Sequence, residues 1–150
     1  MSPVGEEVRA RAQVYRGNTL CQEKTRLLLK EMAVPKGLMP LKDIEEFGHE
    51  KEKGLMWLKQ KQSITHKFKK IGKLVSYGTE ITAVAENSKL KNITGCKGKE
   101  FFLWMSVTEM AVDYPTKGTI TFKTPSGLTR TFPSSVFEDE EDDDDEKEKV

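Results

Sequence analysis

The sequence predicts an α+β fold, with one or two N-terminal helices packed on a mostly antiparallel β-sheet or partial barrel. Three observations support this prediction: helical periodicity in the first third of the chain, alternation of apolar and polar residues from residue 44 onwards, and turn-forming residues between the alternating segments. A chain of 150 residues suits one domain, which can bury about 68–70% of its unfolded surface. We expect that domain to span residues 1–137.

Two apolar repeats at helical spacing predict the N-terminal helical region. The first repeat consists of Val8, Ala12 and Tyr15. The second repeat consists of Leu20, Leu27, Leu28 and Met32. Gly17-Asn18 lies between the repeats and either kinks one helix or separates two. Thr19–Gln22 fits a capping box that would begin the second repeat, and Pro35 would end it.

Alternation with a period of two residues predicts the strands that follow. We expect them at residues 44–47, 55–61, 64–68, 80–86, 89–94, 119–123 and 128–132. The charged segment 48–54, which includes His49, predicts a loop. Asn87-Ser88 fits a two-residue hairpin turn, so the strands on either side of it should pair.

The most apolar segment, residues 99–112, predicts a central strand. Phe101, Leu103 and Met105 alternate with Phe102 and Trp104, so both faces of this strand would be apolar. Strands that are buried on both faces have apolar side chains on both. We therefore expect residues 99–112 inside the sheet, with the N-terminal helix covering one face.

Charge is distributed unevenly along the chain. Residues 138–150 contain ten acidic residues and two lysines, a net charge of −8. Residues 1–137 contain 23 basic and 14 acidic residues, a net charge of +9. Because Val150 is the one apolar residue of the acidic segment, burial cannot offset its ordering entropy, and we expect a disordered acidic tail.

Lysines are concentrated between residues 51 and 73. We expect a basic patch on one side of the sheet, formed by Lys59, Lys61, Lys67, Lys69, Lys70 and Lys73. Such a patch attracts anionic membranes, by about 1 kcal/mol per lysine near an acidic surface. A solvated sheet face that serves solubility is the alternative. Nucleic acid is not expected as a partner, because no aromatic stacking platform accompanies these lysines.

No motif indicates catalysis, a metal site or a cofactor. Cys21 and Cys96 match no metal spacing, and we expect both to be reduced thiols, either buried or half-buried. His66 shares a strand face with Ile64 and Phe68 and would act as a base only with a nucleophile in reach. The candidate nucleophiles are Ser63, Ser76 and Ser106.

The sequence also gives an expectation of where the protein acts. The N-terminus lacks the apolar run of a signal peptide. The longest apolar stretch, residues 101–105, is far too short to cross a bilayer. We expect a soluble, cytoplasmic protein that contacts membranes peripherally.

Seven segments, taken in their order and spacing, resemble a known family. They are Pro35–Pro40, Gly54–Leu58, Tyr77–Thr82, Leu90–Lys99, Phe102–Val107, Ile120–Phe122 and Thr131–Phe137. Over roughly residues 15–138, the size of one domain, the chain resembles the plant family known only as "domain of unknown function 538". The resemblance implies a mostly antiparallel β-domain with an N-terminal helix, similar to one half of the lipid-binding bactericidal/permeability-increasing protein. It also implies a link to plant stress and development, and it supplies no catalytic residues.

The main functional hypothesis is a non-enzymatic binding module for a lipid or another amphipathic ligand. The head of the ligand would meet the basic patch, and its apolar part would contact Trp57, Phe101, Phe102, Trp104 and Met105. A packed core is the alternative role for these five side chains. Two other functions stay open: an esterase-type hydrolase, and a protein-interaction adaptor that uses the acidic tail and a sheet edge.

Overall fold

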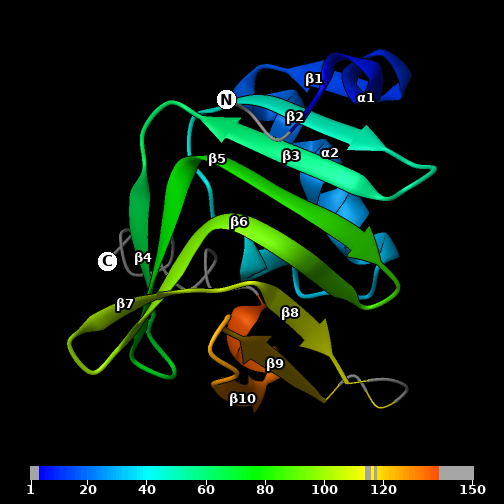
Figure 1. Cartoon of the computed structure of the whole chain (residues 1–150). Coiled ribbons are helices and arrows are strands. Elements are labelled where there is room, and N and C mark those ends of the chain that lie inside the picture. Colours follow the sequence, from blue (N-terminus) through cyan, green and yellow to red (C-terminus); the bar gives the residue numbers. More distant parts are fainter. Residues whose placement is uncertain (1–3, 114–115, 117, 139–150) are drawn as a thin grey trace, which may run out of the picture.

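The computed structural model describes residues 4–113, 116 and 118–138, and Figure 1 shows the path of the chain. The helices in this part are α1 (Glu6–Arg11), α2 (Asn18–Glu31) and two 3-10 helices, η1 (Lys36–Leu38) and η2 (Ser134–Phe137). The predicted acidic tail, apart from Glu138, lies outside the described residues.

The described strands form one ten-stranded sheet, in which every pairing is antiparallel. They are β1 (Gln13–Arg16), β2 (Ile44–Glu50), β3 (Leu55–Gln60), β4 (Ile64–Phe68), β5 (Lys73–Glu86), β6 (Lys89–Glu100), β7 (Leu103–Ser106), β8 (Glu109–Val112), β9 (Thr119–Lys123) and β10 (Thr129–Pro133). Their order is β1-β2-β3-β5-β6-β8-β9-β10, with β4 paired to β5 and β7 paired to β6. The predicted α+β class with a mostly antiparallel sheet is confirmed.

The two longest strands, β5 and β6, give the sheet a corner. Their register shifts between Tyr77 and Thr82 and again between Thr82 and Val84, and such irregularities bend a strand. Gly95 lies at the bend with a φ of +87°, and a Cβ there would overlap the carbonyl oxygen of Glu80. One half of the β5–β6 pair therefore joins β3 and β8, and the other half joins β4 and β7 (Figure 1). We use the name arm for the part of the sheet that consists of β4, β7 and the adjoining halves of β5 and β6.

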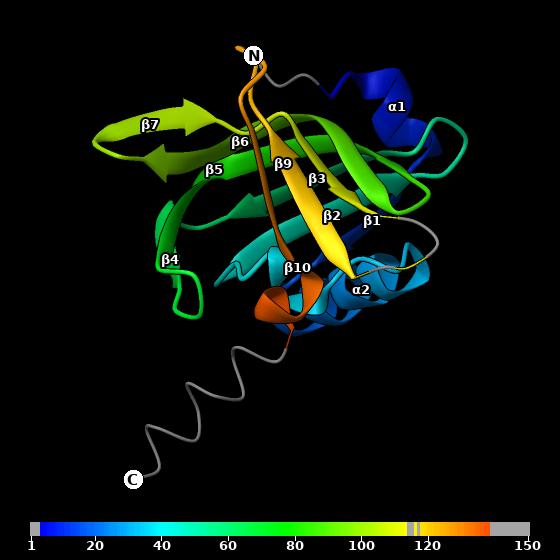
Figure 2. The same cartoon turned by 90° about the horizontal axis from the view of Figure 1, so that it is seen from below.

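The main core lies between the sheet and helix α2. Cross-strand neighbours on this face of the sheet are Tyr15, Phe47, Leu58 and Ile81. Helix α2 adds Cys21, Leu28 and Leu29 to the same buried cluster. Figure 2 shows α2 and η2 on one side of the sheet. Phe137 of η2 is fully buried there, with its ring centre 4.9 Å from that of Phe68, so the end of the described chain closes the core.

Helix α1 covers the opposite face of β2 and β3. Arg9 of α1 donates two hydrogen bonds to the Glu46 carboxylate, at 2.9 and 3.0 Å. The indole N–H of Trp57 donates to the same carboxylate at 2.8 Å. The Trp57 ring lies against Gly48, where a Cβ would overlap it, and is fully buried. Because a six-residue helix is unstable by itself, these contacts hold α1 in place.

The first predicted helical repeat is only partly correct. Gly17 has a φ of +91° and separates α1 and β1 from α2, so the chain is broken there rather than kinked. Tyr15 lies in β1 instead of a helix, because pairing with β2 stacks its ring on Phe47 at a centroid distance of 5.9 Å. Tertiary contacts outweigh helical periodicity in this short segment.

The predicted boundaries of the second helix also differ at one end. The capping box is wrong, since α2 begins at Asn18 and has no capping hydrogen bond from a side chain. The Gln22 amide instead donates to the carbonyl of Leu41 at 2.8 Å, which ties the helix to the following segment. The helix ends at Glu31, before Pro35, as predicted.

The predicted central strand over residues 99–112 is wrong. Strand β6 ends at Glu100, the chain turns at Phe101-Phe102, and β7 and β8 follow as separate strands. The alternation continued across the turn because a two-residue connection keeps the period of two. The predicted turn at Asn87-Ser88 between β5 and β6 is confirmed, and so is the strand at 119–123.

Candidate functional site

The turn between β6 and β7 exposes a run of large apolar side chains. Phe101 is 84% exposed, Phe102 92%, Leu103 68% and Trp104 43%. The other two exposed large apolar side chains among the described residues both lie on helix α2. We call residues 101–104 the aromatic tip. Contiguous exposed apolar surface of this kind marks an interaction site.

The turn is made of residues that do not favour a turn. Glu100 pairs with Leu103, so Phe101 and Phe102 are the whole connection, and Phe101 has a φ of +56°. Two-residue hairpins favour Gly, Asn or Asp at such positions, because a left-handed conformation costs other residues about 1–2 kcal/mol. The β5–β6 hairpin has the common turn residues Asn87-Ser88 instead. Phe101 therefore weakens this turn through its backbone conformation.

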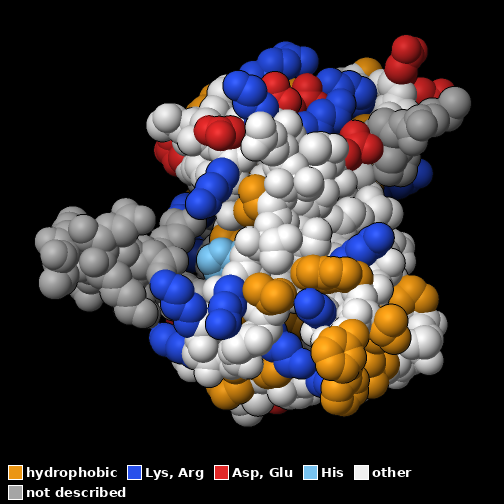
Figure 3. Space-filling view, turned by 90° about the vertical axis from the view of Figure 1, so that its left-hand side faces the viewer, with side chains coloured by type: hydrophobic (Ala, Val, Ile, Leu, Met, Phe, Trp, Pro, Cys, Tyr) orange, Lys and Arg blue, Asp and Glu red, His pale blue; other side chains and the backbone are white. Residues whose placement is uncertain are grey.

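Five lysines of the arm form what we call the basic rim: Lys67 in β4, Lys69 and Lys70 in the β4–β5 turn, and Lys97 and Lys99 in β6. The register places Lys67 opposite Leu74 and Lys99 opposite Trp104, all on the outer face of the arm. The Lys99 ammonium lies 5.8 Å from the centre of the Trp104 ring. Figure 3 shows apolar and basic side chains gathered on this side of the molecule.

Glu100 anchors the base of the tip between two cations. Its carboxylate accepts from Lys73 Nζ with both oxygens at 3.3 Å and pairs with Arg130 Nε at 3.2 Å. These contacts connect β6 to β5 and to β10, so they tie the arm to the β9–β10 hairpin. Segments 61–79 and 87–108 contain no acidic residue besides Glu100. The arm therefore carries an excess of positive charge.

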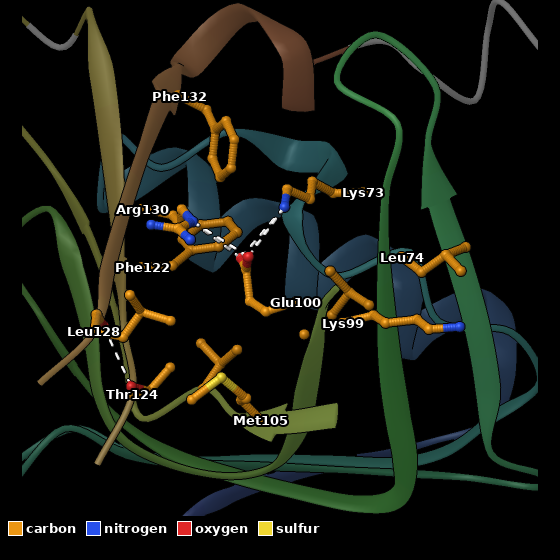
Figure 4. A pocket seen from close by; sticks show the side chains of 13 residues that line it. Lys73, Leu74, Lys99, Glu100, Met105, Phe122, Thr124, Leu128, Arg130 and Phe132 are labelled. Carbon is orange, nitrogen blue, oxygen red and sulfur yellow. Dashed lines mark hydrogen bonds and ion pairs between the residues drawn. The ribbon is translucent and has the colours of Figure 1, made fainter. Parts of the chain in front are cut away.

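A hollow lies next to Glu100, between the inner face of the arm and the β9–β10 hairpin (Figure 4). Its apolar lining consists of Val75, Met105, Val107, Phe122, Leu128 and Phe132. Lys73, Glu100 and Arg130 are its charged side chains, whereas Lys99 and Leu74 point away from it in Figure 4. The cavity volume is about 40 Å³, and the hollow opens to solvent. Apolar walls beside a paired cluster of charges suit an amphipathic ligand.

The five side chains predicted to contact a ligand fall into three places. Phe101, Phe102 and Trp104 belong to the aromatic tip, and Met105 lines the hollow. Trp57 is buried under α1 on the far side of the sheet corner, so it does not join the others. For Trp57 the alternative role in the packed interior is the one that the structure shows.

The predicted basic patch is divided as well. Lys67, Lys69 and Lys70 lie in the basic rim, while Lys73 faces the hollow and Lys61 follows β3. Lys59 lies between the carboxylates of Glu46 and Glu80, at 3.9 and 3.8 Å. Lys97 and Lys99 of the rim were not among the lysines predicted to form the basic patch. The sequence signal that could have identified them is their spacing of two residues, which places both lysines on one strand face shortly before Phe101-Phe102.

A second charged cluster, centred on Glu46, has a structural role. The Glu46 carboxylate meets Arg9, Arg16 and Lys59 at 2.9, 3.4 and 3.9 Å. Hydrogen bonding from Arg9 is the main cause that lowers the pKa of Glu46 to about 2, although burial opposes it. The same bond raises the pKa of Arg9. The cluster fastens α1 and β1 to β2 and β3.

The strand register separates two candidate nucleophiles of the esterase hypothesis, Ser76 and Ser106, from His66. His66 lies opposite Val75 in the β4–β5 register, so it shares the inner face of the arm. Ser76 and Ser106 both lie opposite Lys97, on the outer face. The remaining candidate nucleophile, Ser63, precedes β4. Within the described ranges, no group of three or more His, Cys, Asp or Glu side chains is placed to hold a metal ion.

The other titratable candidates are built into the fold. His49 lies in β2 rather than in the predicted loop, because the strand continues to Glu50. Burial is the main cause that lowers the pKa of His49. Cys21 and Cys96 are buried free thiols, as predicted, and burial raises the pKa of Cys96 to about 12. In the part of the chain that the structure describes, no helix has the length and apolar character to cross a membrane.

Comparison with known proteins gives one match. A family model described as "Protein of unknown function, DUF538" matches residues 25–138, which include the aromatic tip, the basic rim and the hollow. No curated protein and no solved structure matches the chain.

Proposed function

The chain belongs to the DUF538 family, whose description states no function, and we propose from the site itself that the protein is a non-enzymatic module that binds anionic lipid surfaces through the aromatic tip. In this proposal the tip enters the interface between headgroups and acyl chains, and the basic rim stays among the headgroups. The protein would thus contact membranes peripherally.

The observation that carries the proposal is the exposure of four consecutive large apolar side chains at the end of a hairpin. Fully burying one Phe or Leu side chain contributes roughly 1.5–3 kcal/mol, and the free protein forgoes most of this at Phe101 and Phe102, which are 84% and 92% exposed. Aromatic side chains are enriched where bilayer and water meet. A tip of this length suits shallow insertion at the boundary between headgroups and acyl chains.

The basic rim gives the surface its preference for negative charge. Each lysine close to an acidic membrane contributes about 1 kcal/mol, and salt screens this attraction. Lys99 over the Trp104 ring places a cation directly beside the apolar surface. Lysine stems can bury their methylene groups while the ammonium remains in water, so the rim and the tip can bind together.

The shape of the site favours a membrane over a protein partner. A stable protein interface buries roughly 1,200–2,000 Å² in total and needs a complementary surface. The aromatic tip is a narrow projection of four residues. A fluid lipid surface adapts to such a projection without a preformed counterpart.

The other expectations stay predictions. Similarity to half of a bactericidal/permeability-increasing protein, and a role in plant stress or development, come from the family resemblance alone, since no solved structure or curated protein matches. The adaptor hypothesis depends on the acidic tail, which lies almost entirely outside the described residues. The esterase hypothesis gains nothing from the placement of His66, Ser76 and Ser106.

Vesicle flotation tests the proposal with a variant that improves the turn. In the double variant Phe101→Gly/Phe102→Ser, glycine adopts the φ of +56° without strain, so the fold should be kept. The unchanged protein should float with vesicles of phosphatidylserine and phosphatidylcholine, and less so as salt rises. The double variant should stay in solution. Equal flotation of the two proteins, or no flotation of the unchanged one, would overturn the proposal.

Two controls assign the effect to the tip. Leu27→Ser removes an apolar side chain that is 46% exposed on α2, and this variant should float like the unchanged protein. The emission of Trp104 should shift to the blue when vesicles are added, because its ring leaves water. Trp104→Phe should abolish that shift, since the other tryptophan, Trp57, is already fully buried. A shift that survives in Trp104→Phe contradicts insertion of the tip.

A further inference from the structure

We propose that the hollow beside the aromatic tip is a second site, which binds a medium-chain carboxylate with its head at Lys73 and Arg130 and its chain on the apolar lining. The inference rests on the proposed function, because the tip would bring the open side of the hollow to a lipid surface. The residues of the two sites are nevertheless separate, so each can be tested by itself.

The head of the ligand would meet a carboxylate site that is already built. Lys73 and Arg130 hold the Glu100 carboxylate at nitrogen–oxygen distances of 3.2 to 3.3 Å. Tight charge-assisted hydrogen bonds measure about 2.7–2.9 Å, so these contacts are longer than the tightest pairs of this kind. Two cations around one carboxylate also leave one positive charge uncompensated. A ligand carboxylate can therefore replace Glu100 at these cations or share them.

The register sets the direction of the bound chain. Lys73 and Glu100 lie at the end of the arm that carries the β6–β7 turn. The next residue pair along the inner face, further from this turn, is Val75 and Gly98. Met105 lies opposite Gly98 on the other side. A head at Lys73 therefore directs the chain away from the aromatic tip and over these apolar positions. Side chains that cover it from the β9–β10 hairpin are Phe122, Leu128 and Phe132.

The size of the hollow limits how much of a ligand it can enclose. Its cavity volume of about 40 Å³ encloses the end of one acyl chain, and the remainder of the hollow opens to solvent. Two acyl chains of a phospholipid would not fit side by side in that space. We therefore take a single-chain carboxylate as the occupant, with the end of its chain in the cavity and the rest of the chain on the open part of the apolar lining.

Gly98 offers a way to fill the hollow without touching the charges. A Cβ at Gly98 would meet the Cγ2 atom of Val107 at 3.5 Å, which is ordinary contact. Gly98→Ala should therefore be tolerated and leave the hollow open. Gly98→Leu should project into the hollow, because position 98 shares the inner face with Val75 and Met105.

Titration calorimetry of the full chain with decanoate, below its micelle concentration, tests the site. The unchanged protein and Gly98→Ala should bind decanoate, whereas Gly98→Leu should not. Leu128→Trp provides a second way to fill the hollow if Gly98→Leu does not fold. Decyltrimethylammonium has the same chain with a cationic head, and acetate has the head without the chain. Binding of either as tight as decanoate, or tighter binding of decyl phosphate, would overturn the assignment.

Charge variants separate a ligand site from a purely structural ion pair. Lys73→Gln/Arg130→Gln should abolish decanoate binding. Glu100→Gln removes the competing carboxylate, so decanoate should bind about tenfold more tightly, as expected for close like charges. A structural ion pair predicts the opposite, namely weaker binding in Glu100→Gln, and that result would contradict the inference.

Different experimental results would overturn the membrane contact and the carboxylate site. Phe101→Gly/Phe102→Ser should bind decanoate normally while it loses flotation with vesicles. Flotation of the unchanged protein without decanoate binding would overturn the carboxylate site alone. Decanoate binding without flotation would overturn the membrane contact alone.

Discussion

Trp57 and Trp104 lie in two regions of one sheet, and the tryptophan side chain is buried in one region and exposed in the other. Trp57 is fully buried against Gly48 and donates its indole N–H to Glu46. Trp104 is 43% exposed at the aromatic tip, with the Lys99 ammonium over its ring. The neighbours decide the difference, because the Trp57 ring has a glycine that makes room for it and a carboxylate that accepts a hydrogen bond from its indole N–H.

The same contrast holds for the charges of the two regions. Around Glu46 the cations converge on one carboxylate and hold α1 on the sheet. Around the aromatic tip the lysines of the rim outnumber the nearby carboxylates, since Glu100 is the acidic residue there. A closed cluster of this kind contributes to stability, whereas the lysines of the rim lie on the same arm as exposed apolar side chains.

Alanine substitutions at the two tryptophans test this contrast most strongly. Trp57→Ala leaves a cavity under α1 and should lower the free energy of unfolding by about 3–5 kcal/mol. Trp104→Ala removes a ring that supports little of the fold and should change it by less than about 0.5 kcal/mol. Urea unfolding followed by circular dichroism measures both values. Losses of equal size would show that both regions are structural.

Glu46→Gln should have the next largest effect on stability. The pKa of Glu46 is lowered from 4.5 to about 2, which corresponds to about 3 kcal/mol of stability at neutral pH. Glutamine keeps an acceptor for the Trp57 indole but loses the charge that binds Arg9. Urea midpoints at neutral pH measure the loss. Glu109→Gln is the control, because its ion pair with the exposed Lys123 should contribute under about 1 kcal/mol.

The same carboxylate gives the protein a defined pH dependence. The folded-state pKa of Glu46 lies below the unfolded-state value, so its contribution is complete above pH 4.5 and is lost as the pH falls towards about 2. Glu46→Gln should therefore lose less stability than the unchanged protein over that window. Parallel acid unfolding curves for the two proteins would contradict this role of Glu46.

Sequence patterns located the elements that alternate over their own length, such as residues 119–123. They could not find the aromatic tip, because Phe101-Phe102 carries no turn signal and keeps the alternation intact. They also grouped Trp57 with Trp104, since the burial of Trp57 depends on Gly48 across the β2–β3 pair. A pattern within one segment contains no information about such a partner.

The candidate site was only partly predictable for the same reason. The apolar residues of the tip and three lysines of the basic rim were recognisable from their types. The hollow was not, because Arg130 reaches Glu100 from a strand 30 residues away in the sequence. That contact depends on the order of the strands, in which β10 follows β9 and β8 along the sheet.

Gly95→Ala weakens the corner that keeps the two regions apart. Gly95 has a φ of +87°, and a Cβ there would overlap the carbonyl oxygen of Glu80. Strain and overpacking together should lower the free energy of unfolding by about 2 kcal/mol. Gly127→Ala is the matched control, with a φ of +89° and open space around its Cβ, so it should lose about 1 kcal/mol from strain alone. An equal loss in both variants would mean that the close approach at Gly95 has no cost.

Lys99→Gln should have the smallest effect, and it acts on binding alone. Because Lys99 lies over the Trp104 ring at the edge of the tip, its loss should weaken binding to anionic vesicles by about 1 kcal/mol, or about fivefold. Binding to zwitterionic vesicles and the urea midpoint should stay unchanged. Lys91→Gln is the control in the same strand, since Lys91 pairs with Glu86 in the other half of β6. If both variants weaken vesicle binding equally, overall charge rather than the basic rim attracts the membrane, and the contrast between the two regions does not extend to their lysines.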